Sequence, residues 1–181
     1  MAERIAISGS AGVGKSTLAR AVAAELGVPC LPEGMREYLE RTRVNIHDLG
    51  RDGLRDLVLR LWQDRAELEE KHASFVADRA AYDFAAFWMF YGFADDDEAT
   101  HTLFASALRA DRYQAVFLLP WGQIPLVADG IRSTNRYAQL HVQSMIVGLC
   151  AEFGPPVTWV RPTVLAERIA VVCAGRGRPA E

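Results

Sequence analysis

A run of small residues near the amino terminus, GSAGVGKS at positions 9–16, has the composition of a phosphate-binding loop. It fits the pattern G-x-x-x-x-G-K-[S/T], follows a short apolar run and precedes a stretch with helical spacing, which is the context that the pattern requires. Small residues let backbone N–H groups approach phosphate oxygens, and a helix start adds free N–H groups and a positive dipole end. The pattern predicts nucleotide binding by Gly9, Ser10, Ala11, Gly12, Val13, Gly14, Lys15, Ser16 and Thr17.

Lysine is rare in this chain, which makes the one inside the loop informative. The sequence has 18 arginines and only two lysines, Lys15 and Lys71. The ammonium group of Lys15 is expected to neutralise the β- and γ-phosphates as a catalytic residue, and the Ser16 hydroxyl to be a ligand of Mg²⁺. Thr17 either contacts the α-phosphate or packs the helix start. ATP and Mg²⁺ are therefore the predicted cofactors.

An aspartate and an arginine follow a second apolar run, in FVADR. Asp78 stands where a Walker-B-type carboxylate holds Mg²⁺, directly or through water. Arg79 has a fork of donors that suits an anion. The alternative is an ordinary surface ion pair at the end of a strand. With the phosphate loop present, we interpret Asp78 as a catalytic metal ligand and Arg79 as a substrate-binding residue.

The segment PEGMREYLE places a carboxylate and a guanidinium three residues apart, at Glu33 and Arg36. Glu33 is a candidate base for a hydroxyl proton or a candidate positioner of Mg²⁺, and Arg36 a candidate ligand of the phosphoryl acceptor. The alternative is a helix start with ordinary charged residues in its first turns. The pattern alone favours neither interpretation.

Two further arginines lie four residues apart in DGIRSTNR. If this segment closes over bound nucleotide, Arg132 is expected to stabilise charge on the transferred phosphoryl group as a catalytic residue, and Arg136 to bind the nucleotide. Ser133 or Thr134 is the expected cap of the following helix. The alternative is a pair of solvent-facing arginines, which the pattern alone favours for Arg136 and leaves open for Arg132.

The segment YDFAAFWMFYGF is rich in aromatic residues. Phe87, Trp88 or Tyr91 is a candidate for stacking on a planar acceptor, but such a helix more often belongs to the core, and we predict a core role for most of it. Asp83 within this helix is expected to form a salt bridge with an arginine.

The elements that must position these residues alternate between strand and helix. Strands are predicted at 4–8, 28–31, 75–77, 115–119 and 157–160, and helices at 15–26, 35–43, 54–72, 82–93, 137–153 and 162–174. The acidic segment ADDDEA is expected to be a solvated turn that caps one more helix. This alternation indicates an α/β fold with a parallel sheet covered by helices on both faces, whose ligands bind at the carboxyl ends of the strands.

Composition narrows the function further. The length suits one domain, and 50% of the residues are hydrophobic, which is enough for a sizeable core. The net charge of -3 argues against a nucleic-acid partner, and no apolar run is long enough for a membrane span. Three distant cysteines and no apparent leader segment predict a reducing compartment, hence the cytoplasm.

Four segments taken together resemble a family of small bacterial P-loop proteins that carry the AAA label. They are the phosphate loop, LPEGMREYLE, FVADRAAYDFAAF and VADGIRSTNRYAQLH, and the resemblance extends over about residues 3–172. The nicotinamide-riboside kinase domains of NAD-salvage proteins look like relatives, and this group is similar to nucleoside and nucleotide kinases.

The resemblance implies a three-layer P-loop NTPase fold, a five-stranded parallel sheet of order 2-3-1-4-5, ATP with Mg²⁺, and a mobile lid that carries arginines. It implies these site residues: Glu33 and Arg36 on the acceptor side, Asp78 and Arg79 at the metal and phosphates, Arg132 and Arg136 in the lid, and Arg161 in a loop against adenine.

We therefore predict a single P-loop kinase-like domain over residues 1–181, with a short lid around 120–137 and a frayed tail from about 175. The predicted function is ATP-dependent phosphoryl transfer to a small-molecule acceptor, namely a nucleoside, nucleotide or related metabolite, by a monomer or homodimer. The alternative is a P-loop ATPase that acts as a nucleotide-dependent switch on a protein partner. The sequence has no guanine-specific N-K-x-D motif, which disfavours that alternative.

Overall fold

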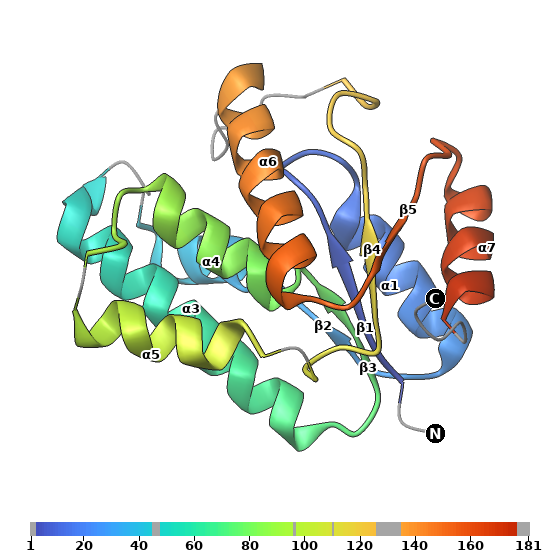
Figure 1. The fold of residues 1–181 in the computed structure, drawn as a ribbon, viewed down its shortest axis with the longest axis horizontal. Coiled ribbons are helices and arrows are strands. Elements are labelled where there is room, and N and C mark those ends of the chain that lie inside the picture. Colours follow the sequence, from blue (N-terminus) through green and yellow to red (C-terminus); the bar gives the residue numbers. More distant parts are fainter. Residues whose placement is uncertain (1–2, 45–47, 96, 110, 126–134, 177–181) are drawn as a thin grey trace.

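A five-stranded parallel sheet forms the centre of the molecule (Figure 1). The computed structural model describes residues 3–44, 48–95, 97–109, 111–125 and 135–176. The strands are β1 (Arg4–Ser8), β2 (Cys30–Leu31), β3 (Phe75–Asp78), β4 (Ala115–Leu118) and β5 (Val157–Trp159). They are arranged in the order β2-β3-β1-β4-β5, and every pair is parallel. The predicted sheet order and direction are confirmed.

Helices cover both faces of this sheet and complete three layers (Figure 1). One face is covered by α1 (Lys15–Leu26) and α7 (Leu165–Gly175), and the other by α3 (Gly50–Lys71), α4 (Ala81–Phe90) and α6 (Arg136–Phe153). The two remaining helices are α2 (Met35–Thr42), after β2, and α5 (Glu98–Ala107), which packs on α3 and α4.

Alternating side chains of β1 divide the core into two parts. Ile5 and Ile7 pack with α1 and α7, whereas Ala6 faces α3, α4 and α6, because successive strand residues point to opposite faces. All three side chains are buried. The burial of β1 from both sides, at the centre of the sheet, fixes the strand from which the phosphate loop starts.

Two helix caps agree with the predictions from the sequence, and one differs. Gly27 ends α1 with a left-handed φ of 65°, and the Asp97 carboxylate accepts from Thr100 N–H at 2.9 Å to cap α5, as predicted for the acidic segment. The cap of α6 was predicted at Ser133 or Thr134, which lie outside the described residues. It is Asn135 instead, whose Oδ1 accepts from the N–H groups of two residues in the first turn of α6.

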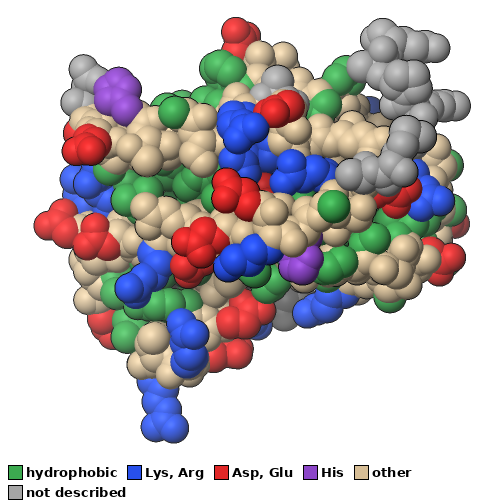
Figure 2. All heavy atoms as spheres, turned by 90° about the horizontal axis from the view of Figure 1, so that it is seen from below, with side chains coloured by type: hydrophobic (Ala, Val, Ile, Leu, Met, Phe, Trp, Pro, Cys, Tyr) green, Lys and Arg blue, Asp and Glu red, His purple; other side chains and the backbone are tan. Residues whose placement is uncertain are grey.

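The surface carries charges of both signs. On the face drawn in Figure 2, arginine and lysine side chains alternate with aspartate and glutamate side chains, and hydrophobic side chains lie between them. In the described part of the chain, no helix combines the length and apolar character needed to cross a bilayer.

Candidate functional site

The phosphate loop connects β1 to α1 at the carboxyl edge of the sheet. It turns sharply with left-handed backbone at Gly9 (φ 136°) and Gly14 (φ 92°). A Cβ at Gly9 would lie 2.8 Å from the Leu119 carbonyl oxygen, and one at Gly14 would lie 2.9 Å from Nη1 of Arg168. Both positions therefore need glycine for the conformation and for the close approach of neighbouring groups.

Lys15 is buried at the first turn of α1, with a relative exposure of 5%. Its Nζ donates a hydrogen bond of 2.5 Å to the carbonyl oxygen of Ser10, across the loop. Burial lowers the pKa of Lys15 to about 7, and the cation of Arg79 contributes in the same direction, although the carboxylates of Asp83, Glu33 and Asp78 oppose it. The ammonium group thus lies among the charged residues that the sequence singled out.

Two side chains from distant helices hold the loop from behind, and the sequence analysis missed both. Gln143 of α6 accepts from Ser10 N–H at 2.7 Å through Oε1 and donates to the Leu119 carbonyl at 3.3 Å through Nε2. Arg168 of α7 donates from Nη1 to the Val13 carbonyl at 2.9 Å. Both are buried. The only signal in the sequence is a polar side chain on the apolar face of an amphipathic helix.

Asp78, the last residue of β3, fits the requirement for a Mg²⁺ ligand. It is paired in register with Ile7 of β1, close to the start of the loop, and is 6% exposed. Its Oδ1 is buried and has no hydrogen-bond partner among the described residues. A buried carboxylate oxygen without a donor is costly, and a hard cation with oxygen ligands offsets that cost. The half-buried Ser16 hydroxyl, on the first turn of α1, is the second candidate ligand.

No group of three or more histidine, cysteine, aspartate or glutamate side chains comes together as a metal cage within the described ranges. Mg²⁺ typically binds through one or two protein groups, with phosphate and water oxygens completing its shell. Asp78 and Ser16 are the candidates for those protein groups.

Arg79 connects the loop region to the neighbouring cavity. Its Nε lies 2.6 Å from Oε1 of Glu33, its Nη1 lies 3.3 Å from Oδ1 of Asp83, and its guanidinium lies 4.7 Å from the centre of the Phe87 ring. Burial alone lowers the pKa of Arg79, but Glu33, Asp83 and Asp78 outweigh it, so the pKa is raised above its ordinary value. The backbone of Arg79 is left-handed (φ 84°), a conformation that costs energy in a residue other than glycine and recurs at functional sites.

Asp83 forms the predicted salt bridge with an arginine, and the arginine is Arg79. The carboxylate also accepts from the Ser8 hydroxyl at 2.5 Å and from Ala80 N–H at 3.1 Å. Burial raises the pKa of Asp83, while Arg79 and Lys15 oppose that shift. Asp83 therefore joins the end of β1 to the start of α4.

Arg65 of α3 fixes the strand ends that carry the two candidate carboxylates. Its buried guanidinium donates to the carbonyl oxygens of Leu31 and Pro32, at the end of β2, and of Asp78 and Arg79, at the end of β3. Five donors in a rigid fork suit this task, and lysine lacks that geometry. The segment before Glu33 and the end of β3 are thereby held together.

A cavity of ≈ 330 Å³ opens beside the phosphate loop. Ala11 of the loop is part of its wall, together with the charged side chains of Glu33, Arg36 and Arg79. The structure thus brings the residues predicted on the acceptor side to one cavity that borders the loop. Its volume lies within the range of small-molecule sites.

Helix α4 and Tyr91, the residue that follows it, supply both core and cavity residues. Tyr82 and Trp88 are buried, and Trp88 Nε1 donates to the Thr100 hydroxyl at 3.0 Å, which confirms the core prediction for them. Phe87 and Tyr91 line the cavity instead, with stacked rings 6.1 Å apart and an interplanar angle of 20°. The candidate for stacking on an acceptor is therefore this pair and not Trp88.

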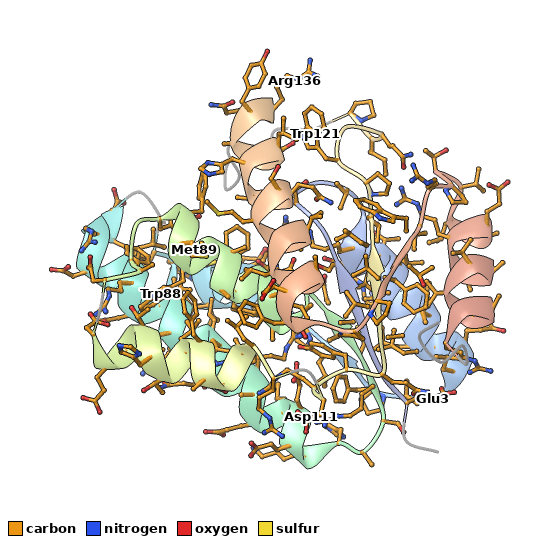
Figure 3. All side chains as sticks on the ribbon, in the orientation of Figure 1. Glu3, Trp88, Met89, Asp111, Trp121 and Arg136 are labelled. Carbon is orange, nitrogen blue, oxygen red and sulfur yellow. The ribbon has the colours of Figure 1, made fainter. Side chains whose placement is uncertain are left out.

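The remaining predicted site residues in the described part of the chain are exposed. Thr17 is exposed on the first turn of α1, and Arg161 is exposed after β5, with its guanidinium 5.9 Å from the Trp159 ring. Arg136 opens α6 and lies 5.4 Å from the Trp121 ring, at the same end of the molecule (Figure 3). Arg132 and half of the predicted lid, as well as the end of the predicted tail, lie outside the described residues.

Comparison with known proteins supports this architecture. The family model described as an AAA domain matches residues 4–168. The structure is similar to that of a NadR protein in complex with NAD and AMP-PNP, with a TM-score of 0.70 and 18% identity over 99% of this chain and 51% of that one. A NadR protein in complex with NR gives a TM-score of 0.72 and 19% identity over 99% of this chain and 53% of that one.

Thymidylate kinase from Candida albicans has a TM-score of 0.68 and 12% identity over 95% of this chain and 90% of that one. The chain spans about half the length of the NadR proteins that it resembles. No curated protein matches the sequence. The fold is that of the P-loop kinases.

Proposed function

The chain belongs to the AAA-domain family, and from that premise and the cavity beside its phosphate loop we propose that it is a small-molecule kinase. In this reaction a hydroxyl oxygen of the acceptor forms a bond to the γ-phosphorus of ATP. The bond from that phosphorus to the β–γ bridging oxygen breaks, ADP leaves, and the hydroxyl proton passes to a base. The observation that carries the proposal is the position of Glu33 and Arg79 on the wall of a cavity that also includes Ala11 of the loop.

The loop residues Gly9 to Thr17 would bind the phosphates of ATP. Lys15 already donates a hydrogen bond to a carbonyl oxygen, and a phosphate oxygen with more negative charge is a better acceptor for the same ammonium group. Asp78 and Ser16 would hold Mg²⁺, which, when bound, neutralises charge on the phosphates.

Glu33 would act as the base for the acceptor hydroxyl. Its ion pair with Arg79 orients the carboxylate. A carboxylate on the cavity wall accepts a proton from a hydroxyl but repels a phosphate dianion, so we propose a hydroxyl acceptor. Arg36 would bind the same substrate from the cavity wall, and the rings of Phe87 and Tyr91 would contact its planar part.

Three further arginines complete the proposal. Arg132 would stabilise charge on the transferred phosphoryl group, Arg136 would bind the nucleotide, and Arg161 would contact the adenine. Support comes from the place of Arg136 at the start of α6 and of Arg161 directly after β5, both toward the edge where the phosphate loop lies. We propose a nucleoside or a related ring compound as the acceptor, and cytoplasmic action by a monomer or homodimer, in keeping with the free thiols of Cys30, Cys150 and Cys173.

The proposal is tested by incubating the protein with MgATP and separate pools of nucleosides, nucleotides and nicotinamide riboside, and measuring ADP. Acceptor-dependent ADP together with a phosphorylated acceptor in the mass spectrum supports the kinase. Slow hydrolysis that no acceptor accelerates, and that a protein partner stimulates, would contradict it in favour of a nucleotide-dependent switch. Lys15→Ala is the control for contaminating activity.

A further inference from the structure

One residue that lines the cavity has a buried amide nitrogen with no hydrogen-bond partner among the described residues. Most buried side-chain nitrogen and oxygen atoms without a partner in the described residues belong to arginines whose other nitrogens are bonded. The exceptions in this part of the chain are Ser10 Oγ, Asp78 Oδ1 and Gln139 Nε2. The first two lie where the proposed nucleotide and Mg²⁺ would bind. Gln139 belongs to α6 and lines the cavity.

Gln143, one helical turn further along α6, contrasts with Gln139 because both the oxygen and the nitrogen of its amide are hydrogen-bonded. Gln143 uses both ends of its side chain, on Ser10 N–H and on the Leu119 carbonyl. Gln139 belongs to the same side of the helix, because residues four apart are neighbours on a helix surface. Its Nε2, which can donate two hydrogen bonds, donates to no described protein group.

The described surroundings of Gln139 on the cavity wall are mostly apolar. Val142 on the same helix and Phe87 and Phe90 on α4 are apolar parts of the same wall. The carboxylate on that wall, Glu33, is already paired with Arg79. A buried donor left without a partner destabilises the fold, so its natural partner is an atom of whatever occupies the cavity.

We propose that Gln139 is a specificity-determining residue, whose Nε2 donates a hydrogen bond to a carbonyl oxygen or ring nitrogen on a planar ring of the acceptor. This inference rests on the proposed function, because it assigns the ring-binding part of the same site. In this arrangement the aromatic side chains of the wall contact the faces of the planar ring and Glu33 contacts the hydroxyl group of the acceptor. Gln139 donates to an atom at the edge of the ring.

The test is binding, measured by calorimetry with MgADP present at saturation so that added ribosides report on the cavity. The probes are uridine, adenosine and nicotinamide riboside, which carry acceptor atoms on the ring, and phenyl C-riboside, which carries none. The variants are Gln139→Leu and Gln139→Glu, which both remove the donor. Gln63→Leu, at an exposed glutamine of α3, is the matched control.

The expected result has two parts. The wild type binds at least one acceptor-bearing riboside roughly tenfold more tightly than phenyl C-riboside, and both Gln139 variants lose that difference while Gln63→Leu keeps it. The Tm of free Gln139→Leu is equal to or above that of the wild type, because the substitution removes a donor without a partner. A merely structural glutamine would give a lower Tm and weaker binding of every ligand, MgADP included.

Three results would overturn the inference: equal riboside affinities in wild type and Gln139→Leu, a lower Tm with a general loss of binding, or no riboside bound by the wild type. Failure of this inference can be distinguished from failure of the proposed kinase activity. A riboside that binds through Gln139 and yields no phosphorylated product would support this inference and contradict phosphoryl transfer.

Discussion

Ser10 and Gln143, which are 133 residues apart in the chain, are joined by a hydrogen bond of 2.7 Å from Ser10 N–H to Gln143 Oε1. Gln143 also donates to the Leu119 carbonyl, so one side chain of α6 bridges the phosphate loop and the segment directly after β4. The Ser10 N–H is thereby engaged by α6.

Replacement of Gln143 by leucine is expected to weaken both stability and nucleotide binding. It leaves the buried Ser10 N–H and Leu119 carbonyl without partners, at a cost of about 1–3 kcal/mol in the free energy of unfolding. A displaced loop should raise KM for ATP, as a coupled assay would show. Ser144→Ala changes the exposed neighbour on α6 and should do neither. An unchanged KM in Gln143→Leu would show that the loop keeps its shape without this bond.

Nucleotide binding near pH 8 is expected to take up a proton through Lys15. Its pKa, lowered by burial to about 7, leaves most of the free protein with a neutral amine at that pH. Phosphates favour the ammonium form, so binding raises the pKa and ATP affinity falls as the pH rises above about 7. Calorimetry in buffers of different ionisation enthalpy measures the uptake. Lys15→Met should abolish it, and equal enthalpies in all buffers for the wild type would contradict the assignment.

The same lysine should make the free protein more stable at alkaline pH. In the unfolded chain it keeps its proton up to about pH 10.5, whereas in the folded protein it loses it above about 7. Between these values the unfolded state binds more protons, so the free energy of unfolding rises with pH. Denaturant titrations of wild type and Lys15→Met at pH values from 7 to 9.5, which lie between the two pKa values of Lys15, isolate its contribution to the free energy of unfolding. A wild-type stability that rises no more than that of the variant would refute it.

Asp78→Asn is expected to raise the Mg²⁺ concentration needed for half-maximal activity. Asparagine keeps the size of the side chain but removes the charge that attracts the cation. A Mg²⁺ titration at fixed ATP measures the shift, with Asp64→Asn, at an exposed position of α3, as the control. Superimposable titrations of Asp78→Asn and wild type would remove Asp78 from the metal site.

Glu33→Gln is expected to lower kcat by roughly 10²–10⁴-fold, the usual contribution of a general base, with a smaller effect on KM for the acceptor. Glutamine keeps the size of the side chain but cannot accept the hydroxyl proton. Steady-state kinetics with the acceptor found in the panel measure the change, and Glu37→Gln on the exposed side of α2 is the control. A variant that raises KM and spares kcat would make Glu33 a binding residue.

Local patterns in the sequence were enough to predict most of the framework. The strand at 4–8 and the helix at 15–26 agree with β1 and α1, because a β-branched run, a glycine-rich loop and a terminal glycine act on neighbouring residues. The strand predicted at 28–31 is shorter, Cys30–Leu31, since β2 is an edge strand that pairs with β3 alone.

The site was harder to predict where two apolar environments look alike in sequence. Phe87 and Trp88 are adjacent aromatic residues of one helix, yet Phe87 lines the cavity and Trp88 is buried against α5. Periodicity separates apolar from polar faces, but it does not separate a core from an apolar cavity. The supports of the loop, Gln143 and Arg168, act across long sequence separations and have no local pattern of their own.

Helix α6 contacts both the phosphate loop and the cavity, so these two parts of the site share one helix. Gln143 touches the loop, while Gln139 and Val142 touch the cavity. By thermodynamic linkage, an occupant that shifts this helix changes affinity at the other end, and the effect is reciprocal. An inhibitor designed for the aromatic wall would therefore be expected to show a potency that depends on how much ATP is present, although it never competes for the same space.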